Sequence, residues 1–387
     1  MKDKPAKYPQ LRFKGFTDSW VQRKVSETAE VNPKTTLPDE FEYVDLGAVV
    51  GTSLNETRHE FKVSAPSRAQ RLASVGDVFY QTVRPYQKNN YLFENAGITP
   101  FVFSTGYAQL RPQGDSYFLL TLLQGENFVS QVMDRSTGTS YPAINSSDLG
   151  NMHVDVPTEA EQVKIGSLFK SLDNLIAANQ RKLDLLKEQK KGYLQKMFPK
   201  NGVKVPELRF AGFADDWEER KLLDIADRFD NLRVPITASN RKSGDTPYYG
   251  ANGIQDYVEG FTHDGEFILV AEDGANDLKN YPVQYVDGKV WVNNHAHVLQ
   301  GKKTITDNKF LMNSIKNFDI EPFLVGGGRA KLNADVMMKL NILLPTFEEQ
   351  EQIGSFFSLL DKTIALHQRK LDLLKEQKKG FLQKMFV

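Results

Sequence analysis

Two stretches in the first half of the chain concentrate basic, amide and hydroxyl side chains. The segment 81–91 reads QTVRPYQKNNY and follows the apolar run GDVFY, so we expect a strand that runs into a polar loop. Arginine forms two hydrogen bonds with guanine, and asparagine or glutamine forms two with adenine. The segment 135–145 adds small hydroxyls and backbone amides suited to phosphate. The candidate DNA-contacting residues are Arg84, Tyr86, Gln87, Lys88, Asn89, Arg135, Ser136, Thr137, Thr139 and Tyr141.

The second half carries its asparagine, glycine and tyrosine mostly in segments 246–257, 271–281, 291–298 and 326–333. The run GGGRAK would let a backbone approach a phosphate, although a bare glycine run is also a simple turn. His295 and His297 share one face if their stretch is a strand, but the sequence places no third metal ligand. The candidate DNA-contacting residues here are Tyr249, Asn252, Lys279, Asn280, Asn293, Asn294, His295, Arg329 and Lys331.

Each of these stretches also fits an ordinary solvated loop, so enzymatic motifs must be weighed as well. The sequence contains neither a GxxxxGK[ST] phosphate loop nor a serine, histidine and aspartate set at informative spacing. Asn32-Pro33-Lys34 is only a fragment of an amino-methyltransferase motif. The loose nuclease pattern PD…ExK occurs at residues 38–39 and 60–62, but the second half has no matching copy. We therefore predict neither a catalytic residue nor a metal site.

A long helical stretch occurs twice and frames the candidate segments. Residues 157–198 and 345–386 match at a constant offset of 188, and 180–192 recurs letter for letter as 368–380. Each copy begins with a predicted capping box, Thr158 with Glu161 and Thr346 with Glu349. Apolar residues then recur in heptads, with polar residues at the same two steps of each copy. The seam consists of Ile165, Phe169, Leu172, Ile176, Leu183, Leu186, Ile353, Phe357, Leu360, Ile364, Leu371 and Leu374.

A seam of this kind needs a partner, and we expect the two copies to pair as an antiparallel coiled coil. About 40 residues at ~1.5 Å each make a rod of roughly 60 Å. The alternative is two amphipathic helices that pack on separate cores. Four residues inserted at Asn179 and at His367 test whether such a rod sets the separation of what it carries.

A second repeat marks where each half begins. Residues 9–24 and 206–221 match at an offset of 197, whereas the segments between the repeats hardly resemble one another. One short correspondence places Gly138 on Gly326 and Asn145 on Asn333. We predict an α+β protein with a pseudo-twofold internal duplication: β-rich domains at 1–156 and 206–344, helices at 157–198 and 345–387, and a linker at 199–205. Similar frames around dissimilar inserts indicate two modules that perform one task on different ligands.

Composition sets further limits. The 387 residues are 40% hydrophobic and 11% aromatic, so real cores are expected. The formal net charge is zero, which argues against a nonspecific polycation. Cysteine is absent, so neither disulfides nor thiolate zinc sites are possible. The sequence shows neither an apolar signal core nor a run long enough to span a membrane, and we expect a cytoplasmic protein.

Together these motifs resemble the specificity (S) subunit of a Type I restriction–modification enzyme. The resemblance covers nearly the whole chain: LRFxGFxxxW at 11–20 and 208–217, the PTxxEQ…IGxxF helix starts, and the KLDLLKEQKKGxLQKMF endings. It implies two target-recognition domains that each read one part of a bipartite DNA site, joined by the paired helices. It also implies a subunit without a catalytic centre or cofactor. Two methyltransferase subunits would supply S-adenosylmethionine chemistry on adenine, and restriction subunits would supply ATP- and magnesium-dependent translocation and cutting.

A binding module of another class stays open: a scaffold or adhesin that presents two β-rich heads on a coiled coil. The missing signal segment weighs against it, and a gel shift with duplex DNA and a methyltransferase partner separates the two. An autonomous nuclease is the enzymatic alternative, which incubation with plasmid and magnesium would expose.

Overall fold

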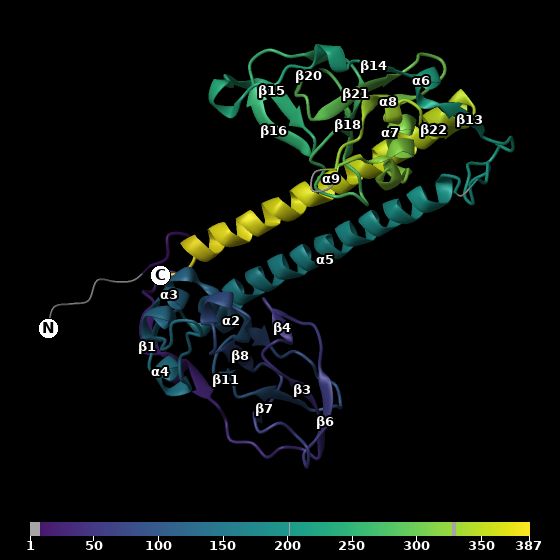
Figure 1. Cartoon of the computed structure of the whole chain (residues 1–387). Coiled ribbons are helices and arrows are strands. Elements are labelled where there is room, and N and C mark those ends of the chain that lie inside the picture. The colour runs from purple at the N-terminus through teal and green to yellow at the C-terminus, as the bar shows by residue number, and fades with distance from the viewer. Residues whose placement is uncertain (1–7, 201, 327–329) are drawn as a thin grey trace. The chain divides into compact units, whose positions relative to one another are not determined.

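The long helices of this chain are divided between two structural units. The computed structural model describes residues 8–200, 202–326 and 330–387. The first unit comprises residues up to 180 together with 370–387, and the second comprises 181–369. Helices α5 (Glu159–Met197) and α9 (Phe347–Lys384) are the longest elements in Figure 1, and each contributes to both units.

The described part of the first unit is built on two four-stranded sheets, ordered β6-β3-β10-β7 and β2-β11-β8-β9. Their strands are β2 (Ala29–Val31), β3 (Glu40–Val44), β6 (Arg58–Phe61), β7 (Ala69–Leu72), β8 (Val78–Gln81), β9 (Tyr91–Leu92), β10 (Phe101–Ser104) and β11 (Tyr107–Pro112). Two smaller ladders pair β1 (Val21–Lys24) with β12 (His153–Val156) and β4 (Val49–Val50) with β5 (Ser53–Leu54). The helices are α1 (Val25–Thr28), α2 (Ser116–Gln124), α3 (Glu126–Arg135) and α4 (Ser146–Gly150).

The second unit repeats this plan in its described residues. Its sheets are ordered β14-β21-β18-β19 and β16-β15-β20-β17, and β13 (Glu218–Lys221) pairs with β22 (Asn341–Leu344). The strands are β14 (Ala226–Arg228), β15 (Ser243–Gly250), β16 (Gly253–Val258), β17 (His263–Asp264), β18 (Phe267–Ala271), β19 (Val283–Val286), β20 (Lys289–Val292) and β21 (Ala296–Gly301). The helices are α6 (Leu222–Ile225), α7 (Asn308–Asn317) and α8 (Ala334–Met337).

The central strand of each unit is buried on both faces. In β8, Phe79 stacks on Phe103 at 3.6 Å between ring centroids, while Tyr80 on the opposite face meets the edge of Phe128. Every residue of β18 is likewise buried. Side chains buried on both faces explain why these strands read as continuous apolar runs rather than alternating ones. Each strand then runs directly into a candidate segment.

The two long helices run antiparallel within each unit. In the first unit, Ile165 and Phe169 near the start of α5 share a core with Met385 just beyond the end of α9. In the second, Met197 at the end of α5 packs with Ile353 and Phe357 near the start of α9. The expected antiparallel pairing is therefore confirmed. Ile165, Phe169, Leu172, Leu183, Leu186, Ile353, Phe357 and Leu371 are buried, and Ile176, Leu360, Ile364 and Leu374 are half-buried.

One of the two polar steps repeated in the seam, Lys190 with its copy Lys378, forms ion pairs. Lys378 lies 2.5 Å from Asp173 in the first unit, and Lys190 lies 2.5 Å from Asp361 in the second. Each pair joins α5 to α9, so this interruption of the apolar stripe is a contact between the helices rather than a defect.

The predicted capping boxes are wrong in one part. The Thr346 hydroxyl does accept a hydrogen bond from the Glu349 amide at 3.4 Å. The glutamate carboxylates, however, do not reach back to the caps. Glu161, fully buried, binds the Arg12 guanidinium through two hydrogen bonds of 2.7 Å, and Glu349 binds Arg209 identically. Buried carboxylates need a charged partner more than an exposed helix start needs a second cap.

Gly125 adopts an extended conformation and separates α2 from α3. Of the helices in the described ranges, none has the length and apolarity needed to cross a membrane.

Candidate nucleic-acid interface

In the first unit, two candidate segments meet at the end of β8. The Ile144 amide donates to the Thr82 carbonyl at 3.0 Å, and the Arg84 amide donates to the Pro142 carbonyl at 2.7 Å. Thr137 and Ala143 exchange two backbone hydrogen bonds of 2.9 Å, which close the loop between them. We call residues 82–89 and 137–143 the first loop pair. The candidate segments 81–91 and 135–145, which are separate in the sequence, therefore lie together in the structure.

Arg84 in the first loop pair has a constrained geometry. Its φ of 54° lies in the left-handed region, which costs a non-glycine residue on the order of 1–3 kcal/mol. Its guanidinium lies 4.1 Å from the ring centroid of Tyr141, whose side chain is 64% exposed. Stacking on an aromatic face holds the planar guanidinium in one orientation. A fixed, planar donor set is what bidentate recognition of guanine requires.

The other candidates of the first unit divide into residues whose side chains make contacts within the protein and residues whose side chains are exposed. Lys88 Nζ lies 2.6 Å from Glu126, the Asn89 side chain accepts from the Gly51 amide, and the Gln87 side chain accepts from Gln81. The Ser136 hydroxyl donates back to Val132 in its own helix. These contacts stabilise the loops. Side chains without such contacts that face solvent belong to Tyr86, Arg135, Thr139 and Tyr141, and Thr137 is exposed beside them.

The second unit builds the same frame from different residues. The Leu332 amide donates to the Glu272 carbonyl at 2.7 Å, and Val325 and Lys331 exchange two backbone hydrogen bonds of 2.9 Å. Gly326 has φ 90° and Gly138 has φ 91°, so the glycines matched by sequence adopt the same left-handed conformation. We call residues 272–277, 325–326 and 330–331 the second loop pair. The candidate Arg329 lies outside the described residues.

Several candidates of the second unit hold loops together. The Asn252 side chain donates to the Gly274 carbonyl and accepts from the Asn276 amide. Asn280 binds Asp277 through its amide and its side chain. Tyr249 is half-buried, and burial raises the pKa of its phenol.

One candidate requires correction. Asn293 is only 3% exposed, and its side chain accepts from the His295 amide. It forms the turn into β21 and has no surface for a base. Lys279 and Asn294 are exposed.

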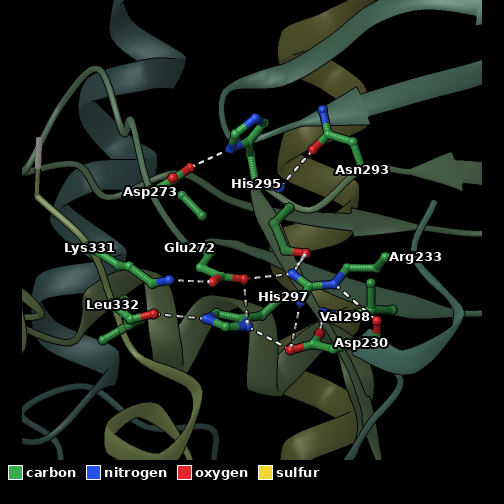
Figure 2. Close-up of polar contacts among 12 residues, drawn as sticks. Asp230, Arg233, Glu272, Asp273, Asn293, His295, His297, Val298, Lys331 and Leu332 are labelled. Atoms are coloured by element: carbon green, nitrogen blue, oxygen red, sulfur yellow. Dashed lines mark hydrogen bonds and ion pairs between the residues drawn. The ribbon is translucent and has the colours of Figure 1, made fainter. Parts of the chain in front are cut away.

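An ionic network surrounds the base of the second loop pair (Figure 2). Glu272 lies between Lys331 and Arg233, at 3.0 Å and 2.7 Å. His297, 1% exposed, contacts the Asp230 carboxylate through Nδ1 at 2.7 Å and the Leu332 carbonyl through Nε2 at 2.8 Å. Beside it, His295 Nδ1 lies 2.5 Å from Asp273. The two histidines therefore have separate carboxylate partners and do not form a joint site.

The network keeps its carboxylates charged. Burial alone would raise the pKa of Glu272, but hydrogen bonds from Arg233 and Lys331 lower it overall. Burial would also raise the pKa of Asp230, but its hydrogen bond with His297, the Val298 amide and the charge of Arg233 lower it.

Asp230, Glu272 and His297 have the donor types of a divalent-metal site. Their spacing fits hydrogen bonds instead. Two zinc ligands at ~2.1 Å in tetrahedral geometry stand about 3.4 Å apart, whereas His297 Nδ1 lies 2.7 Å from Asp230. Glu272 also already has two cationic partners in Arg233 and Lys331. The cluster is an ion-pair network rather than a coordination shell.

Sequence reasoning missed most of this network. Asp230 and Arg233 belong to no candidate segment, and Asp230 lies 67 residues from its histidine partner. Charged residues scattered over such distances carry no periodic signal. The repeats did contain one usable signal: an arginine in each LRF and a glutamate in each EQ recur together, which is consistent with the buried pairs found.

Comparison with known proteins now identifies the family. A family model described as the type I restriction modification DNA specificity domain matches residues 10–188 and 214–376. The chain belongs to this family. Its similarity to a putative type I restriction enzyme specificity subunit from Haemophilus influenzae is 42% identity over 167 residues, 43% of this chain and 42% of that protein. The match therefore spans less than half of that relative.

Solved structures show that the specificity-domain architecture extends over the whole chain. The S subunit of a Type-I restriction-modification system from M. genitalium superposes with a TM-score of 0.71, covering 98% of this chain and 99% of that one at 14% identity. A chain from a study of complex assembly and conformational transition of the type I R-M system matches with a TM-score of 0.51, covering 95% and 97% at 20% identity. At these identities the likeness concerns the fold.

Proposed function

We propose that this chain is a specificity subunit that reads a bipartite duplex DNA target, with each unit reading one part. The observation that carries the proposal is the pair of loops found in each unit. The backbone frame, its closing hydrogen bonds and its left-handed glycine are the same, while the side chains differ. Two units with the same backbone frame and different side chains suit an asymmetric DNA site.

The exposed side chains differ in the kind of DNA contact that they suit: some suit base edges and others suit phosphates. Arg84 on Tyr141 offers a planar donor pair for guanine in the major groove, and the exposed Asn294 offers an amide for adenine. Exposed Arg135 and Lys279 suit phosphate contacts, which position a protein without specifying sequence. The subunit itself performs no chemistry in this proposal. Methyltransferase subunits methylate adenine with S-adenosylmethionine, and restriction subunits supply ATP-driven cutting.

The outer face of α9 supports partner binding. Leu359, Leu366 and Leu373 are 66%, 66% and 62% exposed and lie seven residues apart. Seven-residue spacing places them on one stripe, outside the seam that faces α5. An exposed apolar stripe of this kind suits a helix of another protein. We assign this stripe to a methyltransferase subunit.

The experiment is coexpression of the full chain with a methyltransferase subunit of the same restriction–modification system, followed by mapping of methylated adenines across a genome. A single bipartite motif with two specified parts and an unspecified gap is the expected result. Methylation without sequence preference, or a motif with one continuous part, would contradict the proposal.

A further inference from the structure

We propose that His297 is a positioning residue that, as a doubly protonated imidazolium, fixes the base of the second loop pair. The proposal about DNA reading rests on the function proposed above, whereas the protonation state and the loop geometry stand on the protein alone. His297 lies in β21, touches no candidate DNA contact directly and acts through Leu332 and the carboxylates beside it.

The hydrogen-bond partners of His297 decide how many protons its ring carries. Nε2 lies 2.8 Å from the Leu332 carbonyl, which only accepts, so Nε2 must hold a proton. Nδ1 lies 2.7 Å from the Asp230 carboxylate and 3.7 Å from that of Glu272. A neutral imidazole has one N–H, so the Nδ1 contact needs a second proton, placed either on the ring or on Asp230.

The surroundings of Asp230 place that proton on the ring. Its Oδ1 accepts from the Val298 amide at 2.8 Å, and Arg233 and Arg228 lie 3.5 Å and 3.8 Å from Oδ2. All of these neighbours favour the ionised carboxylate. The charged groups around His297 come from three segments of the chain. Asp230 and Arg233 precede β15, Glu272 follows β18, and Lys331 lies in the second loop pair.

Leu332 transmits the effect of His297 to the loop. Its side chain is fully buried, its amide donates to the Glu272 carbonyl, and its carbonyl accepts from His297. The preceding residue, Lys331, closes the loop with Val325 and pairs with Glu272 through Nζ. Replacement of His297 would remove the ring N–H groups that donate to the Leu332 carbonyl and to Asp230 Oδ2, at the point where the loop is anchored.

The first unit provides an internal control because the position that matches His297 carries no charge. In the strand registers, His297 of β21 lies opposite Val270 of β18, and Ala108 of β11 lies opposite Tyr80 of β8. Ala108 therefore occupies the position in the first unit that matches His297 in the second. Thr82 likewise matches Glu272, since each accepts the anchoring amide of its loop. A defect in the network should therefore alter the second unit alone.

Two measurements on the full chain, without DNA, test the protonation and the anchoring. Nitrogen NMR of ¹⁵N-histidine-labelled protein should show one ring with both nitrogens protonated near pH 7, and this signal should vanish in His297→Gln. Hydrogen exchange at the Leu332 amide should be roughly tenfold faster or more in His297→Gln, because a charge-assisted hydrogen bond is lost. His263→Gln, which removes another buried histidine of the same unit, should leave this exchange unchanged. A neutral ring at His297 in the wild type, or unchanged exchange in His297→Gln, would overturn the proposal.

The coexpressed methyltransferase complex then tests the consequence for reading. In His297→Gln the second part of the methylated motif should lose specificity while the first part stays intact. A complex that methylates without any motif contradicts the proposed function but not the NMR and exchange results. An intact second part in His297→Gln contradicts the positioning role alone.

Discussion

Arg84 combines a strained backbone with a fixed side chain. The guanidinium is held in place before any ligand arrives. The backbone of Arg84 is left-handed, its amide donates a hydrogen bond to the Pro142 carbonyl, and its side chain contacts Tyr141. Preorganised donors lose less conformational entropy on binding than flexible ones. The side-chain types in segments 81–91 and 135–145 made Arg84 and Tyr141 candidate DNA contacts, but the sequence could not predict that the two side chains stack.

Arg84→Ala should therefore relax one part of the methylated motif and leave the other part unchanged. Loss of a bidentate contact costs ~1–3 kcal/mol of discrimination at one base pair. Methylation mapping with the coexpressed methyltransferase measures the effect. Arg135→Ala, an exposed arginine of the same unit, is the control and should weaken binding without changing the motif. An unchanged motif in Arg84→Ala would remove Arg84 from the reading surface.

His263 gives the second unit a pH dependence of its own. It is 2% exposed, and burial lowers its pKa below the usual 6.5, although its hydrogen bond to the Phe229 carbonyl opposes this. The unfolded chain consequently binds the proton more readily, so the free energy of unfolding falls as the pH drops below about 6.5. Urea denaturation of His263→Gln between pH 7 and 5 should show a flatter pH dependence than the wild type. His153→Gln, at an exposed position, should keep the wild-type slope, and an equally steep slope in His263→Gln would exclude this residue as the cause.

At the scale of the elements, the repeated IG motif has a packing reason. A Cβ on Gly166 would meet Asp115 Oδ1 and lie 3.0 Å from the Phe118 amide, because the start of α2 rests directly on α5. Gly354 meets Asp307 and the Phe310 amide in the same way. In both units the aspartate caps its helix by accepting from that phenylalanine amide at 2.7 Å. The glycine therefore makes room for a capped helix end.

Gly166→Ala should destabilise the protein by about 1–3 kcal/mol through overpacking. Gly192→Ala, in the same helix, is a matched control with the opposite sign. Its Cβ would meet nothing within 4 Å, so alanine should stabilise the helix by ~1 kcal/mol. Urea unfolding of both variants measures the difference. Equal stability of the two alanine variants would contradict the packing explanation.

The leucine stripe on α9 yields a second prediction for an element. Leu366→Glu places a charge on the exposed face and should abolish copurification with the methyltransferase subunit, while the free energy of unfolding stays within ~0.5 kcal/mol of wild type. Ala365→Glu, exposed and one residue away on the helix surface, should retain the partner. Retention of the partner by Leu366→Glu would show that this stripe is not its binding surface.

Elements were predictable from the sequence to the extent that their signals were periodic or repeated. The heptads predicted α5, α9 and their antiparallel pairing, because a long apolar stripe has few other ways to be buried. The sheets were predictable only as β-rich segments, since β3 pairs in parallel with β10 almost 60 residues later. The second capping function assigned to Glu161 and Glu349 was wrong because half-buried arginines, 149 and 140 residues away in sequence, compete for the same carboxylates.

For the whole molecule, the paired helices are the covalent route between the units. Each of α5 and α9 begins in one unit and ends in the other. We infer that their length fixes the unspecified gap of the target. Insertion of one heptad at Asn179 and one at His367 preserves the seam and adds about 10 Å of helix, close to three base pairs.

The double insertion should therefore lengthen the gap by about three base pairs and leave both specified parts unchanged, as measured by methylation mapping. A heptad inserted in α5 alone is the control. It shifts one seam against the other and should destabilise the protein. If the double insertion methylates the original motif with the original gap, the helices do not set the spacing.

The exchange of helix ends also bears on how the chain folds during synthesis. Trp20 packs on Phe386 at 6.0 Å, whereas Trp217 packs on Phe198 at 6.0 Å. The second unit is one continuous stretch, 181–369, but the first must wait for residues 370–387. Domains ordinarily fold as they emerge from the ribosome, the earliest one first. We expect the reverse order here: the second unit can close before the first, whose aromatic core lacks Phe386 until residues 370–387 have been translated.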